Sequence, residues 1–297
     1  MRDDLFIGIT SWDSELFLGA CLQSAINNTA GIRVKVVVLD NCSCDQSAQI
    51  VKKYGAELVQ RRTNQAEALN ALLDMSTAKH TLLIHADVIL LSDQWYSLCA
   101  SKISSSTVFV SPHDIGCGPM TRTFGHGHPE SSFMFFDTDA IKAMRRWKLL
   151  KRRFLFPTGF GKRFDFYAPH ITHRIAEMLK SKNKSWHKMQ VHASISQAES
   201  LYRPSWPASQ AAPSEWQASL AYLQYGLGNF YSLDNVVTHY HNWYDRIGAR
   251  NRNSDNTTTE PNNQGYPLDF IHAYSRRFID DFENARVCLP ENLDVDS

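Results

Sequence analysis

Two short polar segments follow apolar runs of the sequence and could together bind a nucleotide and a metal ion. Asp40 and Asn41 end one run, and His85-Ala86-Asp87 ends another. The carboxylate of Asp40 can accept hydrogen bonds from a ribose hydroxyl or a base NH, and the carboxylate of Asp87 can ligate a divalent cation. Taken singly, each carboxylate has a structural interpretation that competes with this one: Asp40 could cap the following helix, and Asp87 could lie in a surface turn. The pair in its strand context predicts a site for a metal-bound nucleotide.

A layered α/β fold would bring these two segments together. Short β-branched runs alternate with helical patterns over residues 5–111, which is typical of a mixed, mostly parallel sheet flanked by helices. Ligands of such sheets bind at the carboxyl ends of the strands, which is where Asp40 and Asp87 fall. The sequence predicts strands at 5–10, 33–40, 56–60, 81–86 and 107–111, with helices around 18–26, 45–54, 65–75 and 92–103.

The second half of the chain has a weaker pattern and is expected to be irregular. A strand is predicted at 131–137, an amphipathic helix near 171–179 and a final helix at 268–284. Much of the chain between the last two helices is rich in proline or in polar residues, which disfavours regular structure. The expected units are 1–250, divided into a ligand-binding half 1–111 and an irregular half 112–250, and a polar linker with a helical tail at 251–297.

Composition and charge exclude several classes of protein. The 297 residues carry 31 Lys and Arg against 30 Asp and Glu, so the net charge of +1 gives no field that would draw the protein to nucleic acid. No apolar run approaches the roughly 20 residues that a membrane-spanning helix needs, and the first residues lack the pattern of a signal peptide. Six scattered cysteines are expected to be reduced thiols. These features favour a cytoplasmic protein without a nucleic-acid partner.

The segments VVVLDNCSCDQS, NQAEALNALL and LLIHADVILL, in this order, resemble the family 2 glycosyltransferases of the GT-A fold. That family shows a strand ending in Asp-Asn-x-Ser-x-Asp, then a helix with an Asn, then a strand ending in an Asp-x-Asp motif that holds metal and nucleotide. The resemblance covers residues 5–111 and implies a Rossmann-like nucleotide-binding sheet. It implies that Asp40 contacts the nucleoside, that Asn70 lies near the diphosphate and that Asp87 binds the metal.

The resemblance implies further donor-binding residues. Thr10, Trp12 and Glu15 would line the base pocket, and a UDP-sugar is the favoured donor. The full set expected to contact the donor is Thr10, Trp12, Glu15, Asp40, Asn41, Arg62, Asn70, His85, Ala86 and Asp87.

The metal site departs from the family pattern, because His85 stands where the first acid of Asp-x-Asp should be. Imidazole can ligate Mn²⁺ and is a poor ligand for Mg²⁺, so Mn²⁺ is the expected cofactor. His85 could instead contact only the ribose, or have no role. The family tends to close its metal site with a histidine after a late strand, and both His239 and His241 fit that place. We expect one of them to reach the ion, and His239 is slightly favoured.

An inverting transfer needs a base that takes the proton of the acceptor hydroxyl. The family's Glu-Asp pair would fall within residues 164–170, where Asp165 is the only acid, so Asp165 is the expected base. If the family's arginine is placed on Arg174 instead, Tyr167 and Ala168 occupy the acidic positions and the site lacks its base. The remaining candidates for a base are Asp114, His113, His126, His128 and His170.

The expected activity is metal-assisted, inverting transfer of a sugar from a nucleotide diphosphate-sugar to a glycan or lipid-linked acceptor, as in polysaccharide biosynthesis. A catalytically silent scaffold that binds nucleotides or sugars is the main alternative. A sugar nucleotidyltransferase is less favoured, because it would need a glycine-rich loop after the first strand, where this chain has Thr10-Ser11-Trp12-Asp13.

A basic segment at 145–153 begins at Arg145 and ends at Arg153. A solvated helix face is the favoured interpretation. Contact with anionic lipid headgroups is the alternative, which would place the protein at the inner face of the membrane. The sequence leaves an oligomer open.

Overall fold

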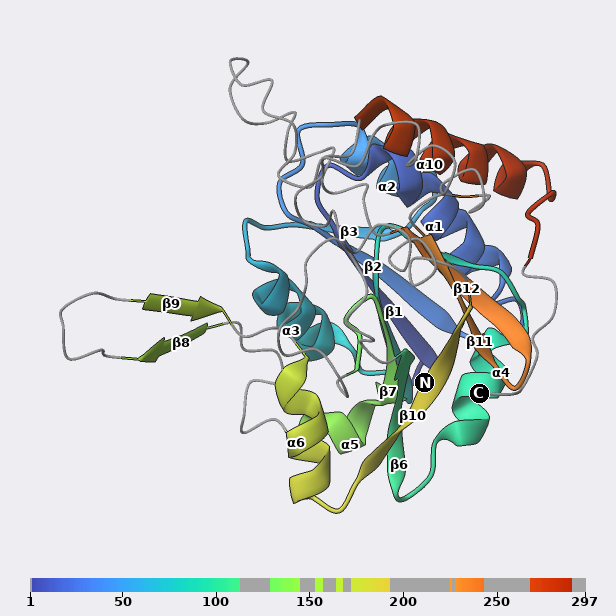
Figure 1. Cartoon of the computed structure of the whole chain (residues 1–297). Helices are drawn as coiled ribbons and strands as arrows, with labels where there is room; N and C mark the ends of the chain where they lie inside the picture. Colours follow the sequence, from blue (N-terminus) through green and yellow to red (C-terminus); the bar gives the residue numbers. More distant parts are fainter. Residues whose placement is uncertain are drawn as a thin grey trace, which may run out of the picture.

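The computed structural model describes residues 2–112, 129–144, 153–156, 164–167, 172–192, 225, 228–242 and 268–289. Ten of the described strands form one curled sheet (Figure 1). In spatial order they are β3 (Glu57–Gln60), β2 (Val34–Asp40), β1 (Leu5–Ser11), β4 (His80–His85), β7 (Phe133–Asp137), β6 (Thr107–Pro112), β10 (Ser185–His192), β11 (Gly228–Leu233), β12 (Val236–Asn242) and β5 (Val88–Leu90).

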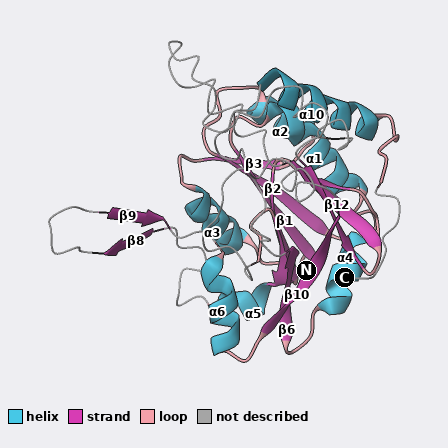
Figure 2. Cartoon of the chain, viewed as in Figure 1, coloured by secondary structure: helices cyan, strands magenta, loops and turns pink. Residues whose placement is uncertain are grey.

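Helices cover both faces of this sheet (Figure 2). One face is packed by α1 (Glu15–Asn27), α2 (Ser47–Lys53), α4 (Trp95–Lys102) and α10 (Leu268–Glu283). The other is packed by α3 (Gln65–Met75), α5 (Thr138–Ala143) and α6 (His173–Ser181). A separate hairpin joins β8 (Arg153–Phe156) to β9 (Phe164–Tyr167). None of the helices that the structure describes combines the length and apolar character needed to span a membrane.

The continuous apolar runs of the early strands explain why helices cover both faces. Successive side chains of a strand point to opposite faces, so a strand covered on both sides needs apolar residues at every position. Phe6 and Ile7 of β1 accordingly lie in different cores, one under α3 and one under α1. Leu82 and Leu83 of β4 divide in the same way. The predicted α/β fold is confirmed, and its early strands lie within one or two residues of the predicted ranges.

The expectation of a mostly parallel sheet fits the first strands but is not exact for the sheet as a whole. β3, β2, β1 and β4 are parallel neighbours, and β10 runs parallel to β6. β7, however, runs antiparallel to both β4 and β6, and β10, β11, β12 and β5 form an antiparallel series. A two-residue turn explains why β11 and β12 are antiparallel. Asp234 and Asn235 adopt positive φ angles of 50° and 64° and join the two strands as a tight hairpin.

The predicted final helix is present as α10 and packs on the sheet. Phe278 is fully buried, and its ring stacks on that of Tyr240 with the centroids 3.7 Å apart. Asn242 donates a hydrogen bond from Nδ2 to Oγ of Ser275 at 3.2 Å. This helix therefore shares the hydrophobic core of β12 and α1. Residues 145–152 of the basic segment and the stretch 243–267, which includes most of the expected linker, lie outside the described residues.

Candidate metal and nucleotide site

Three buried side chains converge beyond the carboxyl end of β4. His85 ends this strand, Asp87 lies in the turn that leads into β5, and His241 lies on β12. One possible ligand atom from each residue lies within 4.8 Å of those of the other two. Strand pairing causes the approach, because β5 runs antiparallel to β12 with His241 opposite Val88. The structure therefore brings together three of the four residues that the sequence proposed as metal ligands.

His239 is the fourth proposed ligand, and the structure places it outside this group. Residues two apart on a strand share a face, so His239 lies on the same side of β12 as His241. It lies nearer the start of the strand. Its ring is stacked between Phe133, at 4.2 Å, and Tyr231, at 4.6 Å. Complete burial lowers its pKa to about 3, which keeps the imidazole neutral. Of the two histidines, His241 lies beside Asp87, whereas the sequence slightly favoured His239.

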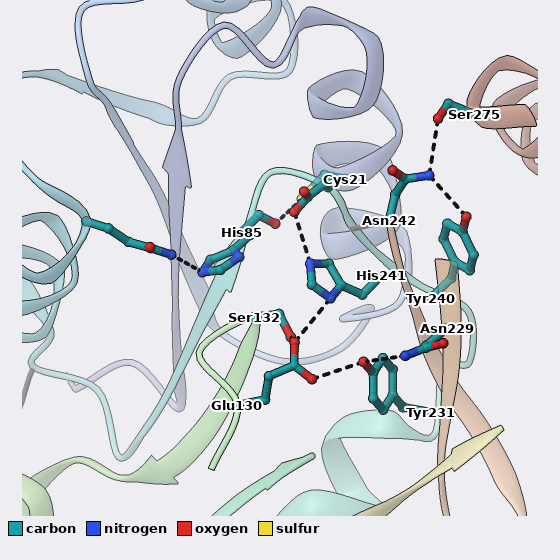
Figure 3. A network of polar contacts seen from close by, with 12 residues as sticks. Cys21, His85, Glu130, Ser132, Asn229, Tyr231, Tyr240, His241, Asn242 and Ser275 are labelled. Carbon is teal, nitrogen blue, oxygen red and sulfur yellow. Dashed lines mark hydrogen bonds and ion pairs between the residues drawn. The ribbon is translucent and has the colours of Figure 1, made fainter. Parts of the chain in front are cut away.

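Two carboxylates flank the His241 ring. Nε2 lies 3.5 Å from Oδ1 of Asp87. Nδ1 lies 3.3 Å from Oε1 of Glu130 (Figure 3). Burial alone would lower the pKa of His241, but the two acids outweigh it and raise the pKa to about 9. Sequence reasoning missed Glu130. The available signal was an acid directly before the predicted strand 131–137.

His85 is oriented from the opposite side of the site. The amide of Gln65, the first residue of α3, donates from Nε2 to Nε2 of His85 at 2.6 Å. Asn64 and Glu67 form a capping box that fixes the start of this helix. The His85 and His241 rings meet edge to face, with centroids 5.8 Å apart. Helix α3 thereby holds one imidazole while β12 holds the other.

The acidic residue at the end of β2 orders its own loop. Asp40 is fully buried and accepts hydrogen bonds from the backbone N and side-chain Oγ of Ser43 and from Nε2 of Gln60. Asn41 accepts a hydrogen bond from the backbone N of Thr63 at 2.7 Å. Asp40 was expected to contact the nucleoside and Asn41 to contact the donor. The described contacts of both residues hold the loops that follow β2 and β3.

The loops after β1 and β2 are also tied to each other. Asp13 accepts from the backbone N of Cys44 at 2.8 Å, and Glu15 accepts from that of Gln46 at 3.2 Å. Asp45 accepts in return from the backbone N of Glu15 at 2.9 Å. The expected base-pocket residue Glu15 therefore has a structural contact of its own. The two loops form one connected rim at the carboxyl edge of the sheet.

Several hydroxyl groups at this edge lack a hydrogen-bond partner among the described residues. They are the buried side chains of Thr10 and Ser11 at the end of β1 and the Oγ1 atom of Thr63. Thr10 pairs with His85 across the β1–β4 register. Buried polar groups are normally satisfied, so these hydroxyls have the capacity to hydrogen-bond to a polar ligand.

The other expected donor-binding residues surround this edge at different depths. Trp12 and Asn70 are half-buried, Arg62 is exposed and Ala86 is buried. The backbone N of Ala86 donates to the carbonyl of Thr10 at 3.0 Å, which connects the turn after β4 to β1. Asn70 lies on α3, the helix that also carries Gln65.

Comparison with known proteins identifies the family. The model of the family described as "Glycosyl transferase family 2" matches residues 6–168, which is more than half of the chain. The chain belongs to glycosyl transferase family 2. A comparison with curated proteins gives no match. The α/β sheet with helices on both faces is the GT-A type of fold that this membership implies.

A comparison with solved structures finds several that are similar to parts of this chain. TarS of S. aureus (residues 1–349) is 20% identical, with 48% of this chain and 49% of that chain covered and a TM-score of 0.37. The mannosyltransferase PcManGT from Pyrobaculum calidifontis, in complex with GDP-Man and Mn²⁺, is 14% identical, with 63% and 55% covered and a TM-score of 0.45. Glucosyl-3-phosphoglycerate synthase from Mycobacterium tuberculosis is 15% identical, with 46% and 57% covered and a TM-score of 0.38. The chain spans about half the length of these structures.

The expected base of this family 2 chain, Asp165, lies in a separate two-stranded sheet. Asp165 lies on β9, opposite Leu155 of β8, and Figure 1 shows this hairpin standing away from the sheet. Tyr167 ends the same strand, and Ala168 lies outside the described residues. The other candidates for a base also lie outside them: Asp114, His113, His126, His128 and His170.

The raised pKa of His241 predicts a pH-dependent stability for this family 2 chain in metal-free buffer. The folded-state pKa, about 9, exceeds the ordinary value of 6.5, so the proton on His241 stabilises the fold below pH 6.5. This contribution is lost as the pH rises through about 9, and amounts to on the order of 3 kcal/mol. Urea unfolding with a chelator present should show that the free energy of unfolding decreases over this pH range. His241→Gln should remove it, and a wild-type stability that falls no more than that of the variant would contradict the assignment.

Proposed function

We propose that this chain transfers a sugar from a nucleoside diphosphate-sugar, a UDP-sugar first among them, to a hydroxyl of a glycan or lipid-linked acceptor with inversion. The observation that carries the proposal is the buried cluster of His85, Asp87 and His241 at the carboxyl edge of the sheet. In open α/β sheets this edge is where ligands bind. Membership of glycosyl transferase family 2 supplies the class of reaction.

A divalent cation fits the residues of the cluster. Two imidazoles and one carboxylate offer mixed nitrogen and oxygen ligands, a set that suits Mn²⁺ and other transition ions better than Mg²⁺, which prefers oxygen. We therefore propose Mn²⁺, held by His85, Asp87 and His241. When bound, the cation would stabilise the charge of the departing diphosphate.

The chain's own groups would bind and orient the donor. The Thr10 and Ser11 hydroxyls would hydrogen-bond to polar groups of the nucleotide, and the half-buried Trp12 ring would pack against the base. Arg62 and Asn70 would face the diphosphate. Asp40 contributes by holding its loop in shape, as its contacts with Ser43 and Gln60 support. The remaining donor contacts would come from the rim formed by Glu15 and Asn41, with Ala86 in the turn beside the ion.

We further propose that residues 1–250 form the catalytic unit, with the donor bound by 1–111 and the acceptor by 112–250, and that 251–297 are a linker and helical tail. A lipid-linked acceptor would place the enzyme at the inner face of the membrane. The basic segment from Arg145 to Arg153 would then contact anionic headgroups. Nothing in this proposal requires a partner subunit.

The test is turnover of a panel of nucleoside diphosphate-sugars with Mn²⁺ and a mixture of glycan and lipid-linked acceptors. We expect one nucleoside diphosphate to be released with the product, and NMR of the product should show an inverted anomeric centre. Asp165, the only acid within 164–170, is the proposed base, so Asp165→Asn should lower turnover by about 10²–10⁴-fold while donor binding persists. A retained anomeric configuration would contradict the proposed reaction.

A silent nucleotide- or sugar-binding scaffold is the second candidate function. Two observations favour it: His85 replaces an acid of the family pattern, and Asp165 lies on a hairpin outside the ten-stranded sheet that carries the cluster. Metal-dependent donor binding by the wild-type chain, with no turnover of any donor in the same panel, would support this scaffold over the enzyme.

A further inference from the structure

Glu130 is a buried acid that the proposed chemistry does not use. Its side chain is 3% exposed and lies beside the metal-binding cluster without belonging to it. Oε1 accepts a hydrogen bond from Oγ of Ser132 at 2.6 Å, and Oε2 accepts one from the hydroxyl of Tyr231 at 3.0 Å (Figure 3). A carboxylate is costly to bury unless several donors surround it. Such a well-satisfied buried acid therefore needs an explanation.

The third group that faces Glu130 is His241. Its Nδ1 lies 3.3 Å from Oε1 of Glu130, while its Nε2 points to Asp87 on the other side of the ring. The hydrogen bond made by one ring nitrogen decides which nitrogen carries the proton. In the neutral imidazole, a proton on Nδ1 would face Glu130, and Nε2 would keep its lone pair on the side of Asp87. This is the arrangement in which an imidazole can ligate a metal.

The carboxylate of Glu130 is itself held by a residue of the sheet. Tyr231 lies on β11, and its ring stacks on His239 at 4.6 Å with an interplanar angle of 12°. Its hydroxyl also accepts a hydrogen bond from Nδ2 of Asn229 at 3.4 Å. A chain of contacts thus runs from β11 through Glu130 to His241. The Glu130 carboxylate is therefore held by hydrogen bonds from Tyr231 on β11 and from Ser132, directly before β7.

We propose that Glu130 is a positioning residue for the metal ligand His241, fixing its tautomer and ring orientation and raising the basicity of Nε2. The inference rests on the proposed metal site at His85, Asp87 and His241. It assigns a role to Tyr231 as well, because its hydroxyl holds the Glu130 carboxylate in place. Outer partners of this kind typically change metal affinity by about 10–100-fold when they are replaced.

The test measures Mn²⁺ binding by the purified full chain from the EPR signal of free Mn²⁺. Glu130→Gln keeps the shape of the side chain but removes its charge, and we expect it to weaken Mn²⁺ binding by about tenfold or more. Tyr231→Phe should also weaken Mn²⁺ binding, but by a smaller factor. Glu130→Asp should bind Mn²⁺ more tightly than Glu130→Gln and less tightly than the wild type. Tyr96→Phe is the matched control, because it removes a tyrosine hydroxyl 3.0 Å from a histidine, His80, at the other end of β4.

A spectroscopic measurement separates positioning from a general loss of stability. The visible absorption of Co²⁺ bound at the same site should change in Glu130→Gln and stay unchanged in Tyr96→Phe, and thermal unfolding of each variant checks that it is folded. Equal Mn²⁺ affinity and equal Co²⁺ spectra in the wild type, Glu130→Gln and Tyr231→Phe would overturn the role of Glu130 alone. Absence of Mn²⁺ binding in the wild type, with and without nucleoside diphosphates, would overturn the metal site as well.

Discussion

Replacing Asp87 with alanine is expected to weaken Mn²⁺ binding by more than about 100-fold and to abolish metal-dependent binding of a nucleoside diphosphate. Asp87 is the only carboxylate of the cluster, and its removal leaves two imidazoles to hold the ion. Loss of a direct ligand should exceed the 10–100-fold effect typical of outer partners. Isothermal titration with Mn²⁺, followed by titration with nucleotide, measures both losses.

The matched control for this variant is Asp137→Ala. Asp137 caps α5, where its side chain accepts a hydrogen bond from the backbone N of Ala140 at 2.7 Å. Its loss should cost about 1 kcal/mol of stability and leave Mn²⁺ affinity unchanged. Asp87→Asn preserves the side-chain shape and should still lose most of the affinity. Mn²⁺ affinity in Asp87→Ala within about threefold of the wild type would place the ion elsewhere.

Replacing His85 with aspartate is expected to shift the metal preference of the site toward Mg²⁺. The substitution exchanges an imidazole for a carboxylate and restores the first acid of the family pattern. Mg²⁺ binds through oxygen ligands, whereas imidazole favours transition ions. We expect the ratio of Mg²⁺ affinity to Mn²⁺ affinity to rise by about tenfold or more, measured by titration of each ion into the same protein.

His85→Asn is the control for this shift, because it removes the imidazole without adding a charge. It should weaken the binding of both ions and leave their ratio near that of the wild type. A ratio that is the same in His85→Asp and His85→Asn would show that the residue at position 85 does not ligate the ion. In that case the contact between His85 and Gln65 would be purely structural.

The early half of the fold could be predicted because its determinants are local. Apolar runs such as the one ending at Asp40 require cover on both faces, and turns with polar residues separate them. The strand that ends at His85 and the turn that holds Asp87 follow from the same pattern. Both residues therefore reach the carboxyl edge of the sheet, as the sequence indicated.

The rest of the site depends on pairings between segments far apart in the chain. Glu130 meets His241 only because β7 runs beside β4 and β12 runs beside β5. The choice between His239 and His241 depends on the rings of Phe133 and Tyr231, which enclose His239. Periodicity within one segment carries no information about such neighbours. The antiparallel direction of the later strands could be anticipated only from the Asp234-Asn235 turn.

The cluster of His85, Asp87 and His241 is proposed to bind a nucleoside diphosphate through a divalent cation. The most direct test is calorimetric titration of the wild-type chain with UDP, GDP, dTDP and CMP, each with and without Mn²⁺. Binding of at least one nucleoside diphosphate that requires Mn²⁺, with UDP first among the candidates, is the predicted result. Binding of none of them in the presence of Mn²⁺, or equal binding with and without the ion, would contradict the claim.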